Sequence, residues 1–468
     1  MELLQTPTIT TFVVDPWADL QGRVQGRVIT PADLQYTAAR QAWNLTVDQY
    51  PAAIVAAQEA ADVVTAVRFA REHDLGIAVQ ATGHGNVRPA NGALLILTAG
   101  LDTLRIDPAR QTAWVGAGLK WQRVLDAAQA VGLAPLLGSS PDVGAVGYTL
   151  GGGMGWLGRK YGLSADSVHA FEVVTMDGQL RRASAMENSD LFWGLRGGGG
   201  SLGIVTGMEI QLYPVTTVYG GNLFYPIDQA EAVFVRYREW VANAPDELTS
   251  SIVIMNFPPI PDVPEPMRGQ SFVIVRGCYA GPVAEGEKLL QLWRAWQAPL
   301  IDDFKPMPFS SVATISAEPI DPLPIFSTGA WLRTLSDEAI ATLIRYGAAH
   351  NGSPLLFAEV RHAGGAIARV QPEAGAYSNR SANHLLHMLG IVPTPEAGIA
   401  LRQHTDQVKS ALQPDLTGGV YMNFLEGEES RQRVSQGFTP AAYQRLTTLK
   451  AVYDGENRLA YGFNITPA

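Results

Sequence analysis

The sequence predicts an α+β protein whose parts differ in their pattern of apolar residues. Strand-like and helical stretches mix with glycine-rich segments over the first 215 residues, whereas residues 218–400 alternate β-rich stretches with helical ones. The second pattern is typical of an antiparallel sheet covered by helices. A chain of 468 residues is also too long for one ordinary core, so we expect two or three domains.

The composition favours a folded protein with a small-molecule ligand. Hydrophobic residues make up 47% of the chain and charged residues 17%, which argues against disorder. The net charge of −10 disfavours nucleic acid or an anionic membrane surface as the main partner. An anionic cofactor would therefore be held by backbone amides rather than by a basic cluster.

Cysteine and histidine usage restricts the other classes of site. Cys278 is the only cysteine, so we expect no intrachain disulfide and a buried, unreactive thiol. His384 and His387 have no third partner at ligand spacing, so we expect no metal site. The first residues lack the basic and apolar regions of a signal peptide, and no run of 18 apolar residues occurs. We therefore expect a cytoplasmic protein with no membrane partner.

The N-terminal part is expected to begin with a strand, a helix and a strand. Residues 51–57 are short and apolar, residues 61–75 carry apolar residues at helical spacing, and residues 76–82 are extended. The helix is expected to bury Val63, Val64, Val67 and Phe69 or Ala70. The second strand leads into a loop in which His84 lies between two glycines.

Further elements follow in order. Short strands are expected at 93–98, 103–107 and 111–118, and an amphipathic helix at 120–133. Residues 167–184 predict a hairpin, because two β-rich runs flank Asp177 and Gly178. A helical turn within 190–203 then precedes a strand at 204–215.

Glycine clusters lie beside these strands, at 83–85, 144–155 and 197–203. Glycine lets backbone N–H groups approach a ligand closely, and a pyrophosphate accepts several such donors at once. Neither of the two commonest nucleotide-binding glycine motifs is present. We predict that the three loops converge on one long ligand; a structural turn is the alternative for the segment 137–161.

The middle of the chain is expected to supply a second domain. Its predicted strands are 250–257, 271–280 and 354–362, and its predicted helices are 228–244, 283–296 and 336–350. Proline clusters at 258–266 and 318–324 are expected to be loops, either at the mouth of a site or as plain connections. The last stretch holds a strand-like piece at 418–424, a helix and a tail. It is too short to fold alone, so we expect it to pack on an earlier domain.

Four motifs in this order resemble the berberine-bridge-enzyme-like branch of the vanillyl-alcohol-oxidase flavoproteins. They are RFAREHDLGIAVQATGHG, GSSPDVGAVGYTLGGGMGWLGRKYGL, DLFWGLRGGGGSLGIVTGMEIQLYP, and YMNF followed by YQRLTTLKAVYD. The resemblance covers residues 45–215 and 418–468 and is weak between them. It implies a two-lobed FAD-binding domain of the PCMH type made from residues 1–215, with the segment 416–468 packing back on it, and an inserted substrate domain at 216–415.

The resemblance also implies which residues bind FAD. His84 falls on the histidine that joins the family's flavin covalently, and Ser140 stands where doubly tethered members carry a cysteine. A hydroxyl is not nucleophilic enough to replace that thiolate, so we expect at most one covalent bond. The expected FAD-binding residues are Gly83, His84, Gly85, Asn86, Ser140, Val143, Gly144, Gly147, Tyr148, Gly151, Gly152, Gly155, Gly203, Val205 and Asn423.

The implied activity is hydride transfer from a small organic substrate to flavin N5, followed by reoxidation with O2 to give hydrogen peroxide. Val143 favours this oxidase reading, since valine at its position goes with oxidases in the family. Phe424 occupies the last place of a Y-x-N-Y motif, where several relatives carry a tyrosine base. The candidates to replace that base are Tyr421, Glu359, His362 and His387, each of which could instead be structural.

Other interpretations stay open on the sequence alone. The protein could be a dehydrogenase with another acceptor and non-covalent FAD, a flavin-binding protein without turnover, or a reductase of cell-wall precursors. Sugars, phenols, and polyketide or alkaloid intermediates are all possible substrates. Arg380 could contact the substrate or hold the inserted domain against the flavin lobe.

Overall fold

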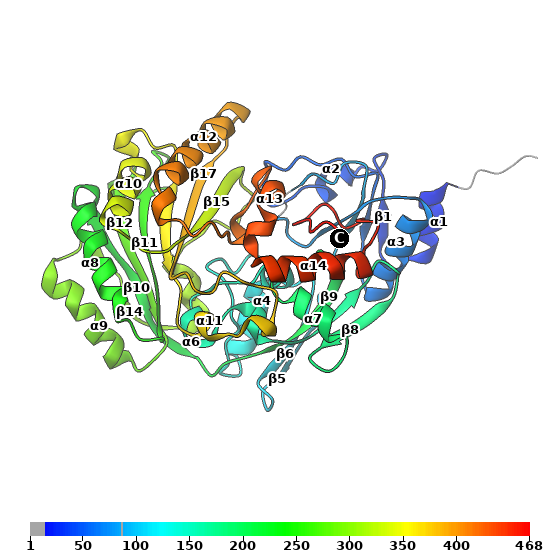
Figure 1. Cartoon of the computed structure of the whole chain (residues 1–468), viewed down its shortest axis with the longest axis horizontal. Helices are drawn as coiled ribbons and strands as arrows, with labels where there is room; N and C mark the ends of the chain where they lie inside the picture. Colours follow the sequence, from blue (N-terminus) through cyan, green and yellow to red (C-terminus); the bar gives the residue numbers. More distant parts are fainter. Residues whose placement is uncertain (1–14, 86–87) are drawn as a thin grey trace, which may run out of the picture.

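The computed structural model describes residues 15–85 and 88–468, which form two lobes side by side (Figure 1). One lobe holds a four-stranded and a five-stranded sheet, and the other holds an eight-stranded sheet with helices on its outer side. The predicted α+β class, with an antiparallel sheet covered by helices in the second half, is confirmed.

The four-stranded sheet is formed by the N-terminal region. Its order is β1 (Arg27–Ile29), β2 (Ala53–Ala56), β4 (Leu94–Leu97) and β3 (Ile77–Gln80), with β2 and β3 parallel to β4. Helices α1 (Pro16–Arg23), α2 (Tyr36–Ala39) and α3 (Ala60–Glu72) accompany it. As expected, α3 buries Val63, Val67, Phe69 and Ala70, while Val64 stays half-buried. Strands buried on both faces need continuous apolar runs, which β2 and β4 have.

The five-stranded sheet is antiparallel and contains the predicted hairpin. Its order is β5 (Leu104–Asp107), β6 (Thr112–Gly116), β9 (Ile204–Gln211), β7 (Val168–Val174) and β8 (Leu180–Ser184). Gly178 has a φ of +73° in the turn between β7 and β8, a conformation that glycine adopts without strain. The helical segments of this region are α4 (Trp121–Gln129), α5 (Ala145–Leu150), α6 (Gly158–Tyr161), η1 (Ser164–Ser167) and α7 (Ser189–Leu195).

The eight-stranded sheet is antiparallel throughout. Its order is β13 (Ile301–Asp302), β10 (Thr217–Pro226), β12 (Ser271–Tyr279), β11 (Leu248–Asn256), β16 (Phe357–His362), β17 (His384–Ile391) and β15 (Ile325–Leu332), and β14 (Lys305–Pro308) also pairs with β10. Helices α8 (Ala230–Ala242), α9 (Val283–Trp296), α10 (Asp337–Gly347) and α12 (Pro395–Ala411) cover its outer face (Figure 1).

Side chains alternate between the two faces of strands β16 and β17, which decides which of their residues face the other lobe. Val360 on β16 and Leu386 and Met388 on β17 belong to the core under the helices. Their neighbours Arg361 and His387 therefore point to the opposite face, because successive strand residues alternate.

The strand expected at 418–424 is wrong. The backbone forms a 3₁₀ turn, η8 (Met422–Phe424), in which the Phe424 N–H donates to the Tyr421 carbonyl. The Asn379 side chain also donates to the Val420 carbonyl at 3.0 Å, so this oxygen is paired outside a sheet. A local turn and partners distant in sequence, such as Asn379, thus satisfy a backbone whose apolar and aromatic residues suggested a strand.

The end of the chain returns to the first lobe, as expected. It contains α13 (Glu429–Gln432), η9 (Val434–Gly437) and α14 (Pro440–Tyr453), and α14 packs against α7. The buried ammonium of Lys450 donates to the Ser201 carbonyl at 3.0 Å, and the Ile77 N–H donates to the Arg458 carbonyl at 2.8 Å. Both bonds connect the tail with glycine-rich or strand segments of the first lobe.

A buried ion pair joins the lobes. The Arg380 guanidinium donates to both carboxylate oxygens of Asp166, at 3.0 and 2.7 Å. Of the two roles that the sequence leaves open, this contact matches the one that holds the inserted region against the first lobe. The remaining short elements of that region are η2 (Ile227–Gln229), η3 (Glu265–Met267), η4 (Phe309–Ile315), η5 (Ala349–Asn351), α11 (Ala366–Arg369), η6 (Pro372–Ala374) and η7 (Gln413–Asp415).

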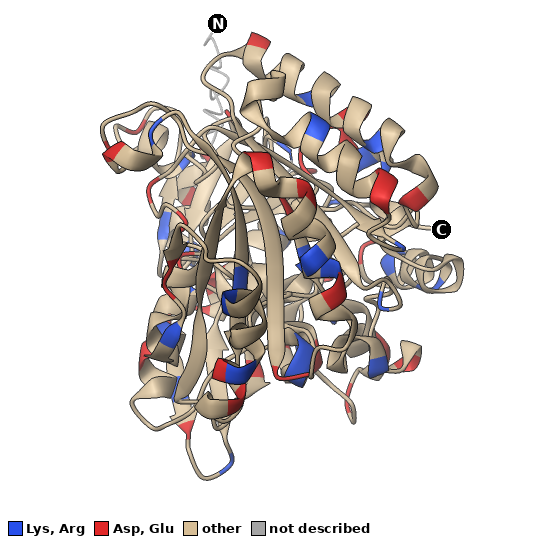
Figure 2. Cartoon of the chain, turned by 90° about the vertical axis from the view of Figure 1, so that its left-hand side faces the viewer, with Lys and Arg blue, Asp and Glu red and all other residues tan. Residues whose placement is uncertain are grey.

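Positions of basic and acidic residues are interspersed along the helices that cover the eight-stranded sheet (Figure 2). Across residues 15–85 and 88–468, none of the helices has the length and apolar character that crossing a membrane requires. Cys278 is fully buried on β12, as expected, and burial raises the pKa of its thiol far above the ordinary value.

Candidate active site

A cavity of about 410 Å³ is lined by residues of both lobes. Loops of the first lobe form one wall, strands β15, β16 and β17 form another, and the turn η8 and the segment that follows it complete the lining. This volume lies within the range of small-molecule sites. Two of the three predicted glycine clusters contribute several residues each, and Gly83 and Gly85 represent the third.

Most of the expected FAD-binding residues line this cavity. They are Gly83, His84, Gly85, Ser140, Val143, Gly144, Gly147, Tyr148, Gly151, Gly203, Val205 and Asn423. Tyr421 lines it as well. Asn86 lies outside the described residues.

Three of the predicted site residues do not line the cavity. Gly152, with a φ of +106°, lies against the Tyr377 ring, and a Cβ at Gly155 would meet the Leu137 carbonyl oxygen. Gly152 therefore permits close packing against the inserted region, and Gly155 permits close packing inside the first lobe. Glu359 is 1% exposed and lies behind Arg361 in the inserted sheet.

The glycine wall is open toward the cavity. A Cβ built at Gly147 or Gly85 would meet no described atom within 4 Å, so both positions border empty space. Gly199 and Gly200, each with a φ of +79°, line the cavity beside Gly203 although only the last was predicted. Among the described residues of this wall, none is a lysine or arginine.

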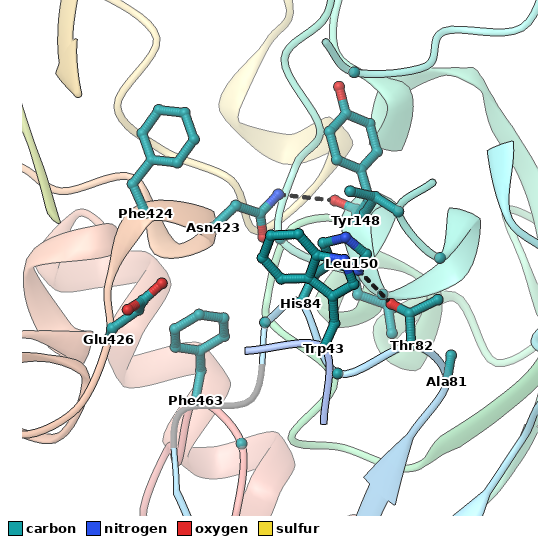
Figure 3. A pocket seen from close by; sticks show the side chains of 18 of the residues that line it. Trp43, Ala81, Thr82, His84, Tyr148, Leu150, Asn423, Phe424, Glu426 and Phe463 are labelled. Carbon is teal, nitrogen blue, oxygen red and sulfur yellow. Dashed lines mark hydrogen bonds between the residues drawn. The ribbon is translucent and has the colours of Figure 1, made fainter. Parts of the chain in front are cut away.

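His84 is held by three neighbours. Its Nδ1 lies 2.8 Å from the Thr82 hydroxyl, and its ring stacks on Trp43 with centroids 4.2 Å apart (Figure 3). Its Nε2 is buried, lies 3.8 Å from an Asp142 carboxylate oxygen, and makes no hydrogen bond to any described residue. Burial lowers the pKa of this imidazole to about 4, so the ring is neutral at pH 7.

The C-terminal turn is locked onto the glycine-rich segment. The Asn423 side chain donates to the Tyr148 carbonyl at 3.0 Å and to the Tyr421 hydroxyl at 3.1 Å (Figure 3). The Tyr421 hydroxyl also accepts the Met154 N–H at 2.9 Å. A Cβ at Gly151 would lie 1.8 Å from the Asn423 amide oxygen, so only glycine allows this approach.

The inserted sheet supplies an aromatic and apolar wall. The rings of Phe424 and His387 are parallel, with centroids 3.7 Å apart, and Phe357 meets His387 edge-on at 5.0 Å. His387 Nε2 lies 2.9 Å from the Ser327 hydroxyl. Burial, assisted by the nearby Arg361, lowers the pKa of His387 to about 3.

Two candidate bases are unsuited to proton transfer at neutral pH. Burial alone would raise the pKa of Glu359, but Arg361 and Arg276 lower it to about 2. His362 does not line the cavity, and burial next to Arg159 lowers its pKa to about 2. A proton acceptor works best when its pKa lies near the working pH.

Glu426 is the residue that the sequence reasoning missed. It lines the cavity, and Figure 3 shows its carboxyl between the rings of Phe424 and Phe463. It accepts hydrogen bonds from the Ser327 N–H at 3.1 Å and from the Asn44 side chain at 3.3 Å. Burial outweighs these bonds and raises its pKa to about 8. Its position two residues after Phe424, at the end of the YMNF motif, could have indicated in the sequence that Glu426 lies near the site.

Comparisons with known proteins agree with this geometry. Residues 51–184 match a family model described as an FAD binding domain. The chain is 28% identical over 456 residues to an uncharacterized FAD-linked oxidoreductase, YgaK, of Bacillus subtilis (strain 168), covering 95% of this chain and 98% of the relative. It is 27% identical over 463 residues to (R)-6-hydroxynicotine oxidase of Paenarthrobacter nicotinovorans, covering 95% and 97%.

The fold is that of a solved relative. The structure of Physcomitrella patens BBE-like 1 superposes with a TM-score of 0.84 at 21% sequence identity, covering 97% of this chain and 100% of that one. The matched domain, the relatives and the shared fold bear out the resemblance in the sequence. The chain therefore carries an FAD binding domain, shares its fold with a BBE-like protein, and is similar over nearly its whole length to FAD-linked oxidoreductases.

Proposed function

We propose that this protein is an oxidase that holds FAD through a single covalent bond at His84 and oxidises a small organic molecule. FAD bound in the cavity supplies a hydride acceptor at N5 and passes the electrons to O2, which gives hydrogen peroxide. Residues 1–215 and 416–468 are the cofactor-binding part in this proposal, and residues 216–415 are the substrate domain.

The observation that carries the proposal is the Nε2 of His84, which makes no hydrogen bond within residues 15–85 and 88–468 and lies on the wall of a cavity lined by glycines. With its proton on Nδ1, the neutral ring donates to Thr82 and leaves the Nε2 lone pair free. A neutral imidazole nitrogen with a free lone pair is what attachment to the flavin 8α carbon requires. Ser140, the second possible attachment position, presents only a hydroxyl.

The glycine wall fits the rest of the cofactor. A pyrophosphate can accept several backbone N–H groups where no Cβ intervenes, and Gly147 and Gly200 leave this room. Gly144, Gly203, Val205, Tyr148 and Asn423 line the same cavity. The chain has a net charge of −10. Backbone N–H groups can hold an anion in such a chain without a cluster of basic side chains.

Val143 and Tyr421 have different roles in this proposal. Val143 lines the cavity next to Gly144, where the family resemblance relates a valine to access of O2. The Tyr421 hydroxyl accepts bonds from Met154 and Asn423, so we assign it to shaping the site. Glu426 is the better proton acceptor, because its pKa of about 8 lies near the working pH of most enzymes.

Acid denaturation of the purified yellow protein tests the attachment. We expect the flavin colour to precipitate with the polypeptide, His84→Ala to release it, and Ser140→Ala to leave it attached. Release of free FAD from the unmodified protein would reject the covalent bond. Hydrogen peroxide production under air without an added dye then separates an oxidase from a dehydrogenase.

A further inference from the structure

The inserted sheet places one guanidinium on the wall of the cavity. Among the described residues that line it, Arg361 is the one lysine or arginine, and its side chain is 16% exposed. It lies near the end of β16, beside the Phe424 ring and within hydrogen-bond reach of Ser139 in the glycine-rich segment. A charge in this position is available to a ligand that lies against the Phe424 and His387 rings.

Two contacts hold the guanidinium in place. Its Nε donates to Glu359 at 2.7 Å, and its Nη2 donates to the Ser139 hydroxyl at 3.3 Å. Its Nη1 makes no hydrogen bond within the part of the chain that the structure describes. A fixed guanidinium with free N–H groups is ready to bind a planar oxyanion, because little side-chain freedom is lost on binding.

The carboxylate that pairs with Arg361 is shared with a second arginine. Glu359 is shared with Arg276 at 3.4 Å, so one carboxylate faces two guanidinium groups. His387 and Glu426 are neutral at pH 7, since their pKa values are about 3 and about 8. Glu318 lines the exposed mouth and lies within electrostatic reach of Arg361 without forming an ion pair with it. Arg361 therefore shares the one carboxylate with which it forms an ion pair, and its Nη1 remains available to a ligand anion.

The surroundings of this charge are flat and apolar. The Arg361 guanidinium carbon lies 5.1 Å from the Phe424 ring centre, and Phe424 stacks on His387. Phe357, Leu389 and Ile391 continue the same wall. The polar residues of this wall, Ser327, His387 and Glu426, bond to one another, which leaves mainly ring faces, aliphatic groups and one cation for a ligand.

We propose that the substrate is a planar apolar ring that carries a carboxylate, and that Arg361 binds this carboxylate while Phe424 and Phe357 contact the ring. The proposal rests on the proposed oxidase function and names its substrate class. A carboxylate matches the guanidinium because it accepts two parallel N–H bonds, which a neutral amide cannot reproduce.

Calorimetric titration of the holoenzyme with benzoate, 2-naphthoate and the matching carboxamides tests the proposal. We expect at least one acid to bind the unmodified protein about 10- to 100-fold more tightly than its amide. Arg361→Gln should reduce this preference to about twofold or less, and Arg361→Lys should retain part of it because the charge remains. Arg123→Gln removes one exposed arginine far from the cavity lining and should leave the preference unchanged.

The outcomes are distinct. Equal binding of acid and amide, binding of neither by the unmodified protein, or a preference that survives in Arg361→Gln would each overturn the carboxylate site. Because calorimetry does not depend on turnover, a protein that prefers the acids but oxidises nothing keeps the carboxylate site and rejects the oxidase. A protein that releases peroxide with neutral substrates only keeps the oxidase and rejects the substrate class.

Discussion

Phe424 lies parallel to His387, with ring centroids 3.7 Å apart and planes 7° apart. The first residue comes from the C-terminal turn η8 and the second from strand β17 of the inserted sheet. The aromatic position that could have carried a phenolic base is thus a packing contact between two distant parts of the chain.

Replacing Phe424 by leucine should therefore destabilise the protein. Loss of the stacked pair is expected to reduce the free energy of unfolding by about 1 kcal/mol. Urea denaturation of the variant, compared with Phe224→Leu on strand β10, measures the difference. Phe224 meets Phe272 edge-on at 6.1 Å outside the cavity lining, so its loss should cost less. Equal stability of the Phe424 variant and the unmodified protein would contradict the role of the stack.

Glu426 should make the stability of the protein depend on pH. An ordinary glutamate has a pKa of 4.5, whereas that of Glu426 is about 8, so between these values the folded chain holds a proton that the unfolded chain has released. Raising the pH then favours the unfolded state, and stability should fall between about pH 4.5 and pH 8. Glu426→Gln should flatten this decline in thermal unfolding midpoints measured across the range. A decline of unchanged slope would contradict the raised pKa.

The same carboxyl should control the rate of substrate oxidation. If Glu426 accepts a proton as hydride leaves, the rate of flavin reduction under nitrogen should rise with pH and level off above about pH 8. Glu426→Gln should be about 100-fold slower and should lose this rise. Stopped-flow absorbance at the flavin band measures both. A glutamine variant that keeps the same pH profile would assign the proton to another group.

A side chain at Gly147 should leave folding unaffected but should impair cofactor binding. A Cβ at this position meets no described atom within 4 Å and points into the cavity, so Gly147→Ala should leave the unfolding midpoint of the apoprotein nearly unchanged. It should reduce the share of purified protein that carries FAD, read from the ratio of absorbance at 450 and 280 nm. Gly22→Ala is the matched control, since Gly22 is equally open but lies on α1 outside the cavity lining. Full FAD occupancy in both variants would remove Gly147 from the cofactor wall.

Arg380 should contribute strongly to the attachment of the two lobes. Its two bonds to Asp166 are buried, and Arg380→Ala leaves that carboxylate with only Arg196, at 3.9 Å, as a cationic neighbour among the described residues, at a cost of about 3 kcal/mol. Arg369→Ala, which removes an exposed pair with Asp246, should cost less than about 1 kcal/mol. Thermal unfolding of the two variants compares them. Similar small shifts in both would mean that the Asp166 pair does not stabilise the interface.

Local sequence patterns were sufficient where the element depends on its own residues. The helix α3 and the hairpin of β7 and β8 follow from apolar spacing and from the turn residues Asp177 and Gly178. The strand expected at 418–424 was wrong because its backbone bonds are satisfied by Asn379 and by its own turn, and such partners are distant or invisible in a local pattern.

Some residues of the candidate site could likewise be found from the sequence, and others only from the structure. The sequence by itself determined the glycine clusters, His84 between two glycines, and the phenylalanine at position 424, because each is a property of residue type and order. Only the tertiary structure decided that Glu359 stays charged beside two arginines, that the pKa of Glu426 is raised, and that Arg361 lines the cavity. Burial and charge pairing depend on distances between β11, β12, β16 and the C-terminal turn, and no spacing along one chain encodes those distances.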